Sequence, residues 1–431
     1  MARSRKSFSA FSGNGILYCM AFILFFSGWL MVMTGKLALA PAISLPDIIP
    51  PLFMAASFLV VWLIIWLSGF RGDQFIPLLT LLLAGIGLLV QFRLGVFDFG
   101  DAPRASAYAY PLGVFAFLFT WLLFRAGRHS WLSALAVPCL LAACALLGGI
   151  LLFGTRFRGA IFLAGQLNPA ELVKLLLAVF LAWVMTEYRK PLKQTVAGIP
   201  APPIRPLLTL ALLWVLPMGL LIAQRDLGMI ILLNLVLLVL VFMATGRWGY
   251  LAVGGAIAAL AGYAGFQLFA HARLRFIAWQ DPFSDPTGSG WQILQSLSAM
   301  FSGGMWGSGL GAGAPSIVPI AASDFVYAAI AEELGFVGCV FLAMLYLSLF
   351  YRGYRVADQQ RNLFAQTLAA AITTMLALQV LMNIGGVTKA IPLTGITLPL
   401  ISHGGSSLVT SFAMLGLLTA LSEPASGRGR K

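Results

Sequence analysis

Long apolar segments recur along almost the whole chain, and polar connections separate them. Each segment is close to the length that an α-helix needs to cross the hydrocarbon core of a bilayer, about 20 residues. We therefore predict an all-α, polytopic membrane protein with about 12 transmembrane helices. The predicted helices cover residues 15–34, 50–68, 75–92, 109–124, 131–153, 168–186, 207–223, 227–245, 248–270, 324–351, 364–384 and 404–422.

One stretch interrupts this pattern. Between residues 271 and 338 the apolar run gives way to glycines, prolines, two arginines and a group of carboxylates. Only 10% of the residues in the chain are charged, so carboxylates gathered in one segment mark the place where we expect the chemistry, and loops commonly carry it.

The composition excludes a soluble fold. Hydrophobic residues make up 60% of the 431 residues, and the mean hydropathy is +0.94. A soluble domain needs far more charge on its surface. The basic start of the chain leads into the segment 15–34 without a small-residue cleavage site, so we expect a first membrane helix there.

The net charge of +13 does not indicate nucleic-acid binding, because the basic residues follow the connections between spans. If the N-terminus is cytoplasmic, the connections on that side carry the basic surplus, as cytoplasmic loops usually do. We expect both termini in the cytoplasm and the 271–323 loop outside. The basic connections hold Arg71, Arg125, Arg128, Arg189, Lys190, Lys193, Arg205, Arg247, Arg352, Arg355 and Arg361.

Charged residues near the membrane are the next candidates. Glu171 and Lys174 are three residues apart near the start of a predicted helix, so they share a face. Such a pair is costly in a membrane unless it faces a polar cavity or a partner. A simple internal ion pair is the alternative interpretation. Arg156 and Arg158 form a basic hairpin that either holds a phosphate or anchors at the interface. Asp226 follows Arg225, and the two charges either neutralise each other or serve a ligand.

The 271–323 loop contains two Asp-Pro pairs, at Asp281 and Asp285. The glycines at 288 and 290 permit a backbone turn that can aim a carboxylate into a cleft. Gln292 and Gln295 then lie on roughly one face of a following helix. The glycine-rich run at 303–313 does not match a phosphate-binding loop, because no strand precedes it.

Two helix starts carry polar residues. Asp324 opens a predicted helix, where either capping or chemistry explains it. Ser402, His403, Ser406 and Ser407 open the last helix, whose free N–H groups and dipole favour an anion, although capping alone also explains the serines. No metal-ligand spacing is present, and the four cysteines lie in apolar segments, which favours packing.

Together these motifs resemble the SEDS family of RodA, FtsW and SpoVE, over residues from about 154 to 422. They occur in the family's order, although the family more often has Gln-Pro-Ser-Glu, Pro-Asp-Leu-Gly, His-Thr-Asp-Phe and Ser-Tyr-Gly-Gly-Ser-Ser. The motifs are Asn168-Pro169-Ala170-Glu171 with Lys174, Arg225-Asp226-Leu227-Gly228, Asp285-Pro286 with Gly288, Gly290, Trp291 and Gln292, Ser323-Asp324-Phe325, Glu332-Glu333-Leu334-Gly335 and Ser402-His403-Gly404-Gly405-Ser406-Ser407.

The resemblance implies an inverting peptidoglycan glycosyltransferase that polymerises lipid II at the outer face of the cytoplasmic membrane. The family's essential aspartate corresponds to Asp285, which would be the catalytic base, with Asp281 as the second candidate. Cations near the departing diphosphate would stabilise its charge. No cluster of residues in the sequence requires a cofactor. A divalent cation (Mg²⁺ or Mn²⁺) that bridges the diphosphate and a carboxylate is compatible with the sequence. The expected substrate-binding residues are Arg156, Arg158, Glu171, Lys174, Asp226, Arg273, Arg275, Asp281, Gln292, Gln295, Asp324, Lys389, Ser402, His403, Ser406 and Ser407.

The familiar members have about ten spans, so residues 1–130 are expected to include two extra helices. Residues 131–423 would form the catalytic membrane core, and residues 424–431 a cytoplasmic tail. Expected partners are lipid II, membrane lipid and a class B penicillin-binding protein with one membrane helix. A lipid II flippase and a non-catalytic scaffold for a transpeptidase are the alternatives, and a role in elongation, division or sporulation is not distinguished.

Overall fold

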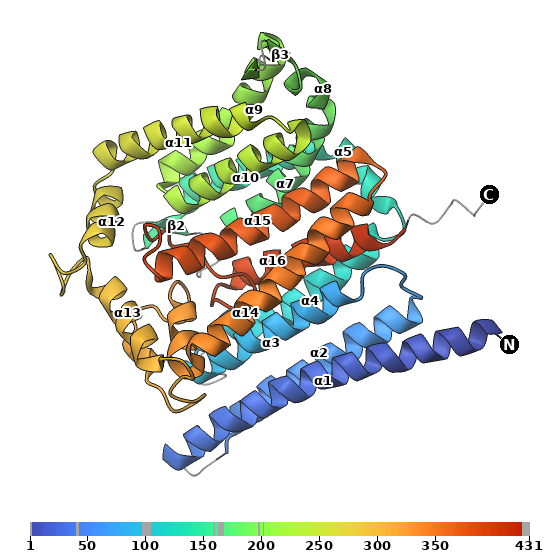
Figure 1. The fold of residues 1–431 in the computed structure, drawn as a ribbon, viewed down its shortest axis with the longest axis vertical. Helices are drawn as coiled ribbons and strands as arrows, with labels where there is room; N and C mark the ends of the chain where they lie inside the picture. The colour runs from blue at the N-terminus through green and yellow to red at the C-terminus, as the bar shows by residue number, and fades with distance from the viewer. Residues whose placement is uncertain are drawn as a thin grey trace. The chain divides into compact units, whose positions relative to one another are not determined.

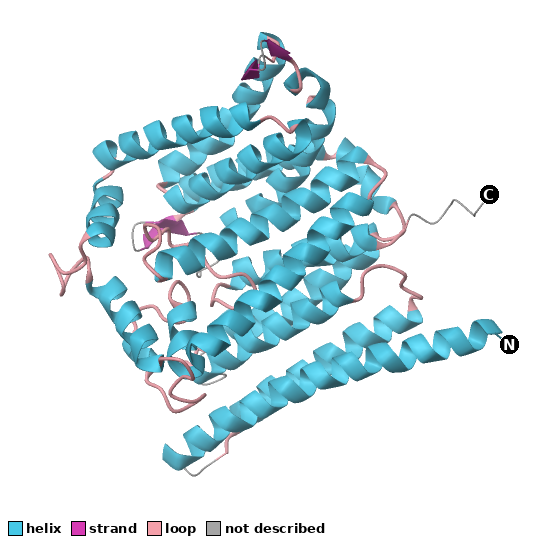
Figure 2. Ribbon diagram, in the orientation of Figure 1, coloured by secondary structure: helices cyan, strands magenta, loops and turns pink. Residues whose placement is uncertain are grey.

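A computed structural model describes residues 2–39, 43–96, 105–157, 160–162, 168–196, 199–200 and 202–424. Nearly all of the described elements are helices (Figures 1 and 2). The chain divides into two compact units: unit 1 comprises residues 1–127, 295–352 and 397–431, and unit 2 comprises residues 128–294 and 353–396.

Unit 1 is built around the pairing of α4 with α16. Gly113 of α4 lies against Phe412 of α16, and Gly416 of α16 lies against Phe117 of α4, so a side chain at either glycine would collide. The same two helices share a hydrogen bond from Thr120 Oγ1 to the carbonyl oxygen of Ala413 at 3.0 Å. Small residues thus allow close approach of the backbones, as is common between membrane helices. The helices of this unit are α1 (Ala2–Leu39), α2 (Leu45–Leu67), α3 (Phe75–Arg93), α4 (Ala105–Phe124), η2 (Pro315–Ile317) and α16 (Gly405–Ser422).

Two helices belong to both units along the chain: α13 (Trp291–Gly303) and α14 (Val326–Gln359). The backbone of α14 leaves helical geometry at Gly335, with φ 65° and ψ −169°. The last carbonyl groups before this break, at Glu332 and Glu333, accept hydrogen bonds from the N–H groups of Ser308 and Gly309. The glycine-rich run at 303–313 therefore binds the end of the first part of the broken helix and has a structural role.

Unit 2 is organised around α7, which packs against α6 and α15, while α10 also packs against α15. Most positions of α15 are buried. A helix with apolar residues on nearly every side is expected to be buried in this way. By contrast, α11 has no buried residue. The helices are η1 (Arg128–Ser130), α5 (Trp131–Ala134), α6 (Ala136–Phe153), α7 (Ala170–Glu187), α8 (Arg189–Leu192), α9 (Ile204–Gln224), α10 (Leu227–Thr245), α11 (Trp248–Leu268), α12 (Ala270–Gln280) and α15 (Leu363–Val387).

Two small antiparallel hairpins complete unit 2. Strands β1 (Thr155–Phe157) and β2 (Ala160–Phe162) pair with Arg156 opposite Ile161, and β3 (Thr195–Val196) pairs with β4 (Ile199–Pro200). Each hairpin lies in a connection between helices and adds no layer to the fold.

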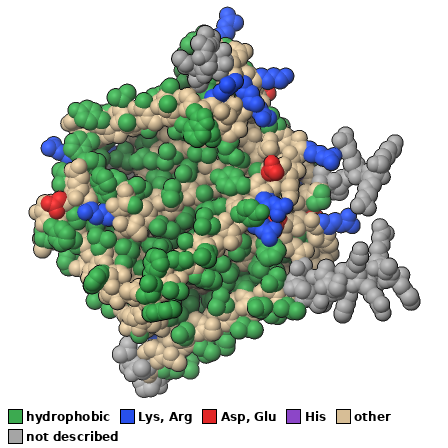
Figure 3. Space-filling view, viewed as in Figure 1, with side chains coloured by type: hydrophobic (Ala, Val, Ile, Leu, Met, Phe, Trp, Pro, Cys, Tyr) green, Lys and Arg blue, Asp and Glu red, His purple; other side chains and the backbone are tan. Residues whose placement is uncertain are grey.

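The predicted all-α polytopic membrane architecture is confirmed. A helix coincides with each of the twelve predicted segments. Among the described residues nine helices are long and apolar enough to cross a membrane, or ten if the pair Tyr108–Phe124 and Arg128–Ala134 forms one broken span. The other two predicted spans fall below that measure because α7 carries three charges and the apolar part of α9, Leu208–Gln224, is short. Hydrophobic side chains dominate the face drawn in Figure 3.

Candidate functional site

An ion pair lies at the start of α7. Lys174 pairs with the Glu171 carboxylate one helical turn earlier, and its Nζ also donates a hydrogen bond to Oε1 of Gln379 on α15 at 3.1 Å. Lys174 is 1% exposed and Glu171 is 14% exposed. A charge this deeply buried requires such partners, so α7 and α15 are joined here by a polar contact in an otherwise apolar interface.

Asp226 caps the N-terminus of α10, where its Oδ1 accepts a hydrogen bond from the N–H of Met229 at 3.0 Å. Removal from water raises the pKa of Asp226, while the Met229 bond lowers it. The charges of Glu171, Lys174 and Arg275 also act on this carboxyl. The structure therefore gathers four of the expected site residues in unit 2, together with Gln379; we call these five residues the ionic cluster.

The short helix α12 carries the two loop arginines. Nη1 of Arg275 donates to the carbonyl oxygens of Thr394 at 3.1 Å and Leu393 at 3.4 Å. The Arg273 guanidinium lies 5.7 Å from the ring centre of Phe266, within the range of a cation–π interaction. Arg275 thus ties α12 to the segment that follows α15, and both arginines remain exposed.

Asp285 is exposed in the turn between α12 and α13, and its carboxylate is fixed by residues of the same turn. Oδ2 accepts hydrogen bonds from the N–H of Ser289 at 2.7 Å and from Oγ of Ser289 at 3.0 Å, and Oδ1 accepts from the N–H of Gly288 at 3.1 Å. The Ser289 bonds foremost, with the Gly288 bond, lower the pKa of Asp285 below its ordinary value of 3.8. A side chain at Gly288 would collide with this carboxylate, so glycine at this position leaves room for the orientation that Asp285 has.

The other expected residues of this loop lie on either side of Asp285. Asp281 is exposed directly after α12, and its Oδ1 accepts a hydrogen bond from the N–H of Phe283 at 3.0 Å. Gln292 and Gln295 lie one turn apart on α13, and both are partly exposed. The predicted amphipathic helix after the Asp-Pro turn is therefore present.

Lys389 lies just after α15, in an unusual backbone conformation. The helix ends in a Schellman arrangement, in which the N–H of Ala390 donates to Gly385 at 2.8 Å and the N–H of Lys389 to Gly386 at 3.3 Å. Lys389 has φ 61° at the position where glycine is usual, which costs about 1 kcal/mol for a residue with a side chain. Its carbonyl oxygen accepts a hydrogen bond from Trp279 Nε1 at 3.0 Å, and its Nζ lies 3.5 Å from the carbonyl oxygen of Gln280.

Five further expected residues lie in unit 1: Asp324 before α14, Ser402 and His403 before α16, and Ser406 and Ser407 in the first turn of α16. Oγ of Ser402 donates to the carbonyl oxygen of Ser323 at 2.5 Å and accepts from the N–H of Leu398 at 2.8 Å. The N–H of His403 donates to the carbonyl oxygen of Ala322 at 2.6 Å. These bonds join the segment before α16 to the segment before α14 that contains Asp324.

The serines of this motif do not cap α16 by a side-chain hydrogen bond. Ser407 instead shares a 2.7 Å hydrogen bond with Thr397, and Ser406 lies in the first turn of the helix. The N-cap position itself is Gly404, and the role expected for the serines stays a prediction.

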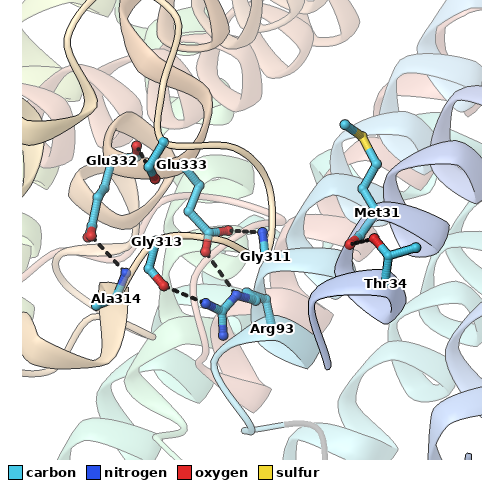
Figure 4. A network of polar contacts seen from close by, with 9 residues as sticks. Met31, Thr34, Arg93, Gly311, Gly313, Ala314, Glu332 and Glu333 are labelled. Carbon is cyan, nitrogen blue, oxygen red and sulfur yellow. Dashed lines mark hydrogen bonds and ion pairs between the residues drawn. The ribbon is translucent and has the colours of Figure 1, made fainter. Parts of the chain in front are cut away.

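A second charged network in unit 1 joins the end of α3 to the glycine-rich run and to α14 (Figure 4). Nε of Arg93 donates to Oε1 of Glu333 at 2.8 Å, and Nη2 of Arg93 donates to the carbonyl oxygen of Gly313 at 2.7 Å. Glu333 also accepts from the N–H of Gly311, and Glu332 accepts from the N–H of Ala314 at 2.8 Å. Both carboxylates are largely buried, and they hold the glycine-rich run against α14.

Two expected cations cannot be placed. Arg158 lies outside the described residues, and of Arg156 only the backbone, in β1, is described. Within the described part of the chain, no three or more His, Cys, Asp or Glu side chains are grouped so that they could hold a metal ion.

Two partners in these networks were not expected from the sequence. Gln379 lies in the middle of an apolar segment and is buried, as Lys174 is. A polar side chain in such a segment indicates a buried polar contact. Arg93 is the last residue of α3, just beyond the predicted span 75–92. The partners described for these residues, Lys174 for Gln379 and Glu333 for Arg93, are distant in the sequence, so only the fold shows these contacts.

Comparison with known proteins places the chain in a family. Residues 102–426 match the family model FtsW/RodA/SpoVE, described as "Cell cycle protein". The peptidoglycan glycosyltransferase RodA of Mycobacterium tuberculosis is 37% identical over 358 residues, which are 80% of this chain and 76% of that protein. Stage V sporulation protein E of Bacillus subtilis is 33% identical over 363 residues, covering 81% of this chain and 96% of the relative.

Solved structures share the fold. A chain from a structure described as "Structural coordination of polymerization and crosslinking by a peptidoglycan synthase complex" is 30% identical, with a TM-score of 0.65 over 82% of this chain and 98% of that one. The crystal structure of the rod shape determining protein RodA of Thermus thermophilus is 26% identical, with a TM-score of 0.58 over 82% and 97% of the two chains. The chain is a multi-pass membrane protein and belongs to the family of the FtsW, RodA and SpoVE cell cycle proteins.

Proposed function

We propose that this protein is a peptidoglycan glycosyltransferase that polymerises lipid II, with Asp285 as the catalytic base. The observation that carries the proposal is the exposed Asp285 carboxylate, which a glycine-containing turn holds in one orientation. Membership of the family and the names of its relatives support the same activity. Lipid II combines a membrane-bound tail with a charged diphosphate, which suits a membrane protein with an ionic cluster.

In the proposed reaction an acceptor sugar hydroxyl attacks the anomeric carbon of the donor in a single displacement that inverts the configuration. The carbon–oxygen bond to the diphosphate breaks as the new glycosidic bond forms, and Asp285 accepts the hydroxyl proton. Lys174, Arg273, Arg275 and Lys389 are the described cations proposed to stabilise the departing diphosphate. Glu171 and Asp226 would hold Lys174 and Arg275 in position, because each carboxylate acts electrostatically on the cluster.

The lowered pKa of Asp285 has two consequences for this role. The carboxylate is ionised at neutral pH and ready to accept a proton. A carboxylate with a low pKa is also a weak base, since general bases work best with a pKa near the operating pH. Enclosure of Asp285 by the bound substrate would remove water and raise its pKa, so the base would strengthen when the acceptor binds.

We include in the proposal a divalent cation that would bind the diphosphate of the substrate. The described residues do not form a three-ligand site, so Mg²⁺ or Mn²⁺ would need the diphosphate for most of its ligands. Loss of polymerisation in a chelator, with recovery on adding Mg²⁺ or Mn²⁺, would establish the requirement.

We further propose that both termini face the cytoplasm and that the Asp285 turn faces outward, in the cytoplasmic membrane of a bacterium. The distribution of basic residues supports this orientation. A class B penicillin-binding protein is the proposed partner, and the similarity to a chain of a peptidoglycan synthase complex supports it.

The test is the formation of glycan polymer from purified protein and lipid II. Asp285→Asn keeps the size of the side chain but removes the proton acceptor, so we expect polymerisation to fall by about two orders of magnitude or more. Asp281→Asn is the matched control in the same loop and should cost less. Near-normal polymerisation by Asp285→Asn would remove Asp285 as the base, and the opposite ranking would assign the role to Asp281. Transport of lipid II across vesicles without polymer would favour a flippase instead.

A further inference from the structure

The turn that contains Asp285 is held together from within. All the hydrogen bonds on its carboxylate come from Gly288 and Ser289, and the N–H of Gly290 donates to the carbonyl oxygen of Asp285 at 3.0 Å. The turn therefore has a fixed internal geometry. Its placement relative to the ionic cluster must come from contacts outside the turn, and α12 leads directly into it.

Two side chains of α12, one helical turn apart, attach this helix by hydrogen bonds to the segment that follows α15. Arg275 donates to the carbonyl oxygens of Leu393 and Thr394, and Trp279 Nε1 donates to the carbonyl oxygen of Lys389 at 3.0 Å. Arg275 is exposed, whereas Trp279 is partly buried and packs against Phe276, with ring centres 5.4 Å apart. The preceding helix α11 contacts α12 through Phe266, which packs against Phe276 and Arg273, but α11 itself has no buried residue.

The acceptor of the Trp279 hydrogen bond is placed by the end of α15. Lys389 has its left-handed conformation because it occupies the Schellman position, and this conformation orients its carbonyl group. The same helix carries Gln379, which binds Lys174 of the ionic cluster. A continuous path of contacts therefore runs from the cluster through α15 and Lys389 to Trp279, and Asp285 follows Trp279 by six residues.

We propose that Trp279 is a positioning residue for Asp285, and that Lys389 acts in this support through its main-chain carbonyl group. The indole N–H and the Lys389 carbonyl form a strut that sets the distance between the Asp285 turn and the ionic cluster. This inference rests on the proposed function, since the catalytic role of Asp285 comes from there. It changes the role expected for Lys389, whose contribution would come from backbone geometry more than from its charge.

Trp279→Phe tests the strut because it keeps an aromatic ring and removes the N–H donor. We expect kcat for polymerisation to fall about tenfold while KM for lipid II changes little, since misplacement of the base affects the reaction more than binding. The acid limb of the pH profile should not move, because the bonds that lower the pKa of Asp285 lie within its own turn. Trp248→Phe, an exposed tryptophan at the start of α11, is the matched control. A wild-type kcat in Trp279→Phe would overturn the proposal.

Two substitutions at Lys389 separate the carbonyl from the charge. Lys389→Gly and Lys389→Val both remove the ammonium group, but glycine accepts a positive φ and valine strongly disfavours it. We expect the glycine variant to keep several-fold more kcat than the valine variant. Equal loss in both would show that the charge is what matters and would overturn the role of the carbonyl.

Hydrogen exchange provides a measurement that does not depend on turnover. Without the strut, the end of α12 and the turn after it should open more often, so amides of residues 277–290 should exchange faster in Trp279→Phe than in Trp248→Phe. Unchanged exchange would contradict the strut even if the wild-type protein made no polymer. Absence of polymer from the wild type, with faster exchange in Trp279→Phe, would instead count against the proposed function alone.

Discussion

At the scale of single residues, the carboxylates of this protein are in two contrasting environments. Asp285 is exposed, and hydrogen bonds to its charged form lower its pKa. Asp226 is partly buried, and the resulting loss of hydration raises its pKa. The first environment keeps a carboxylate ionised, whereas the second needs the nearby Lys174 and Arg275 to make ionisation favourable. Environments that move pKa values apart in this way are typical of functional sites.

The pH dependence of polymerisation follows from the Asp285 environment. A base must be deprotonated, so activity that depends on Asp285 is complete above its pKa and is lost as the pH falls through it. Since that pKa lies below 3.8, kcat/KM, which reports the free enzyme, should show no decline from Asp285 between pH 7 and about pH 5. Ser289→Ala removes the hydroxyl donor and keeps the backbone N–H, so the acid limb should move upward.

Rates measured with wild type and Ser289→Ala across this range check both statements, and Ser284→Ala in the same loop is the control. An acid limb near pH 6 in the wild type would show that the base is another group or that Asp285 is enclosed before substrate binds. An acid limb that stays in place in Ser289→Ala would contradict the role of the hydroxyl group.

At the scale of elements, the break in α14 is the feature around which the glycine-rich run of unit 1 is organised. Gly335 has φ 65° and ψ −169°, a region open almost only to glycine. Its position leaves no room for a side chain, because a Cβ would meet the backbone of Trp306 and Gly307. The freed carbonyl groups of α14 then accept hydrogen bonds from the glycine-rich run.

Gly335→Ala should therefore destabilise the protein strongly. Backbone strain of about 1–3 kcal/mol adds to a steric clash with main-chain atoms, which cannot move aside as a flexible side chain can. Gly262→Ala on α11 is the matched control, since nothing lies within 4 Å of that position and its φ is not positive. Thermal unfolding in detergent measures both, and equal stability of the two variants would contradict the assigned geometry of the break.

The membrane spans could be predicted from the sequence, whereas the break in α14 and the contact between α7 and α15 could not. The spans follow from continuous apolar segments, because burial in lipid demands a hydrophobic surface whatever the helix contacts. The break at Gly335 could not be predicted in the same way, since it depends on the approach of Gly307, which is 28 residues earlier in the chain. The Glu171–Lys174 pair was predictable from their spacing, but Gln379 required the packing of α7 on α15.

At the scale of the whole molecule, the family match begins at residue 102, so α1, α2 and α3 lie outside it. α1 nevertheless contacts the glycine-rich run within unit 1: a side chain at Gly35 would meet the carbonyl group of Gly311, whose N–H binds Glu333. The first helices are therefore packed onto the network of Figure 4 through a contact that only small residues permit.

The proposed partner, a class B penicillin-binding protein, would need an apolar helix surface on which to pack. Large apolar side chains are exposed on α1, α9, α11 and α14, and in a membrane these surfaces contact lipid or another helix. A transpeptidase with one membrane helix that packs there and holds the outer loop in its working geometry would shift a conformational population. We expect weak polymerisation by the protein alone and about a tenfold rise when the cognate class B penicillin-binding protein is co-reconstituted, a difference of about 1.4 kcal/mol.

Two versions of the partner make this test specific. A transpeptidase without its catalytic serine should still activate, because holding a conformation needs no cross-linking chemistry. A soluble form without the membrane helix should activate less at equal concentration, because tethering in the same bilayer raises the effective concentration. Equal turnover with and without saturating partner would show that this protein is not regulated through a conformational population, and activation only by the catalytically active partner would point to removal of product as the cause.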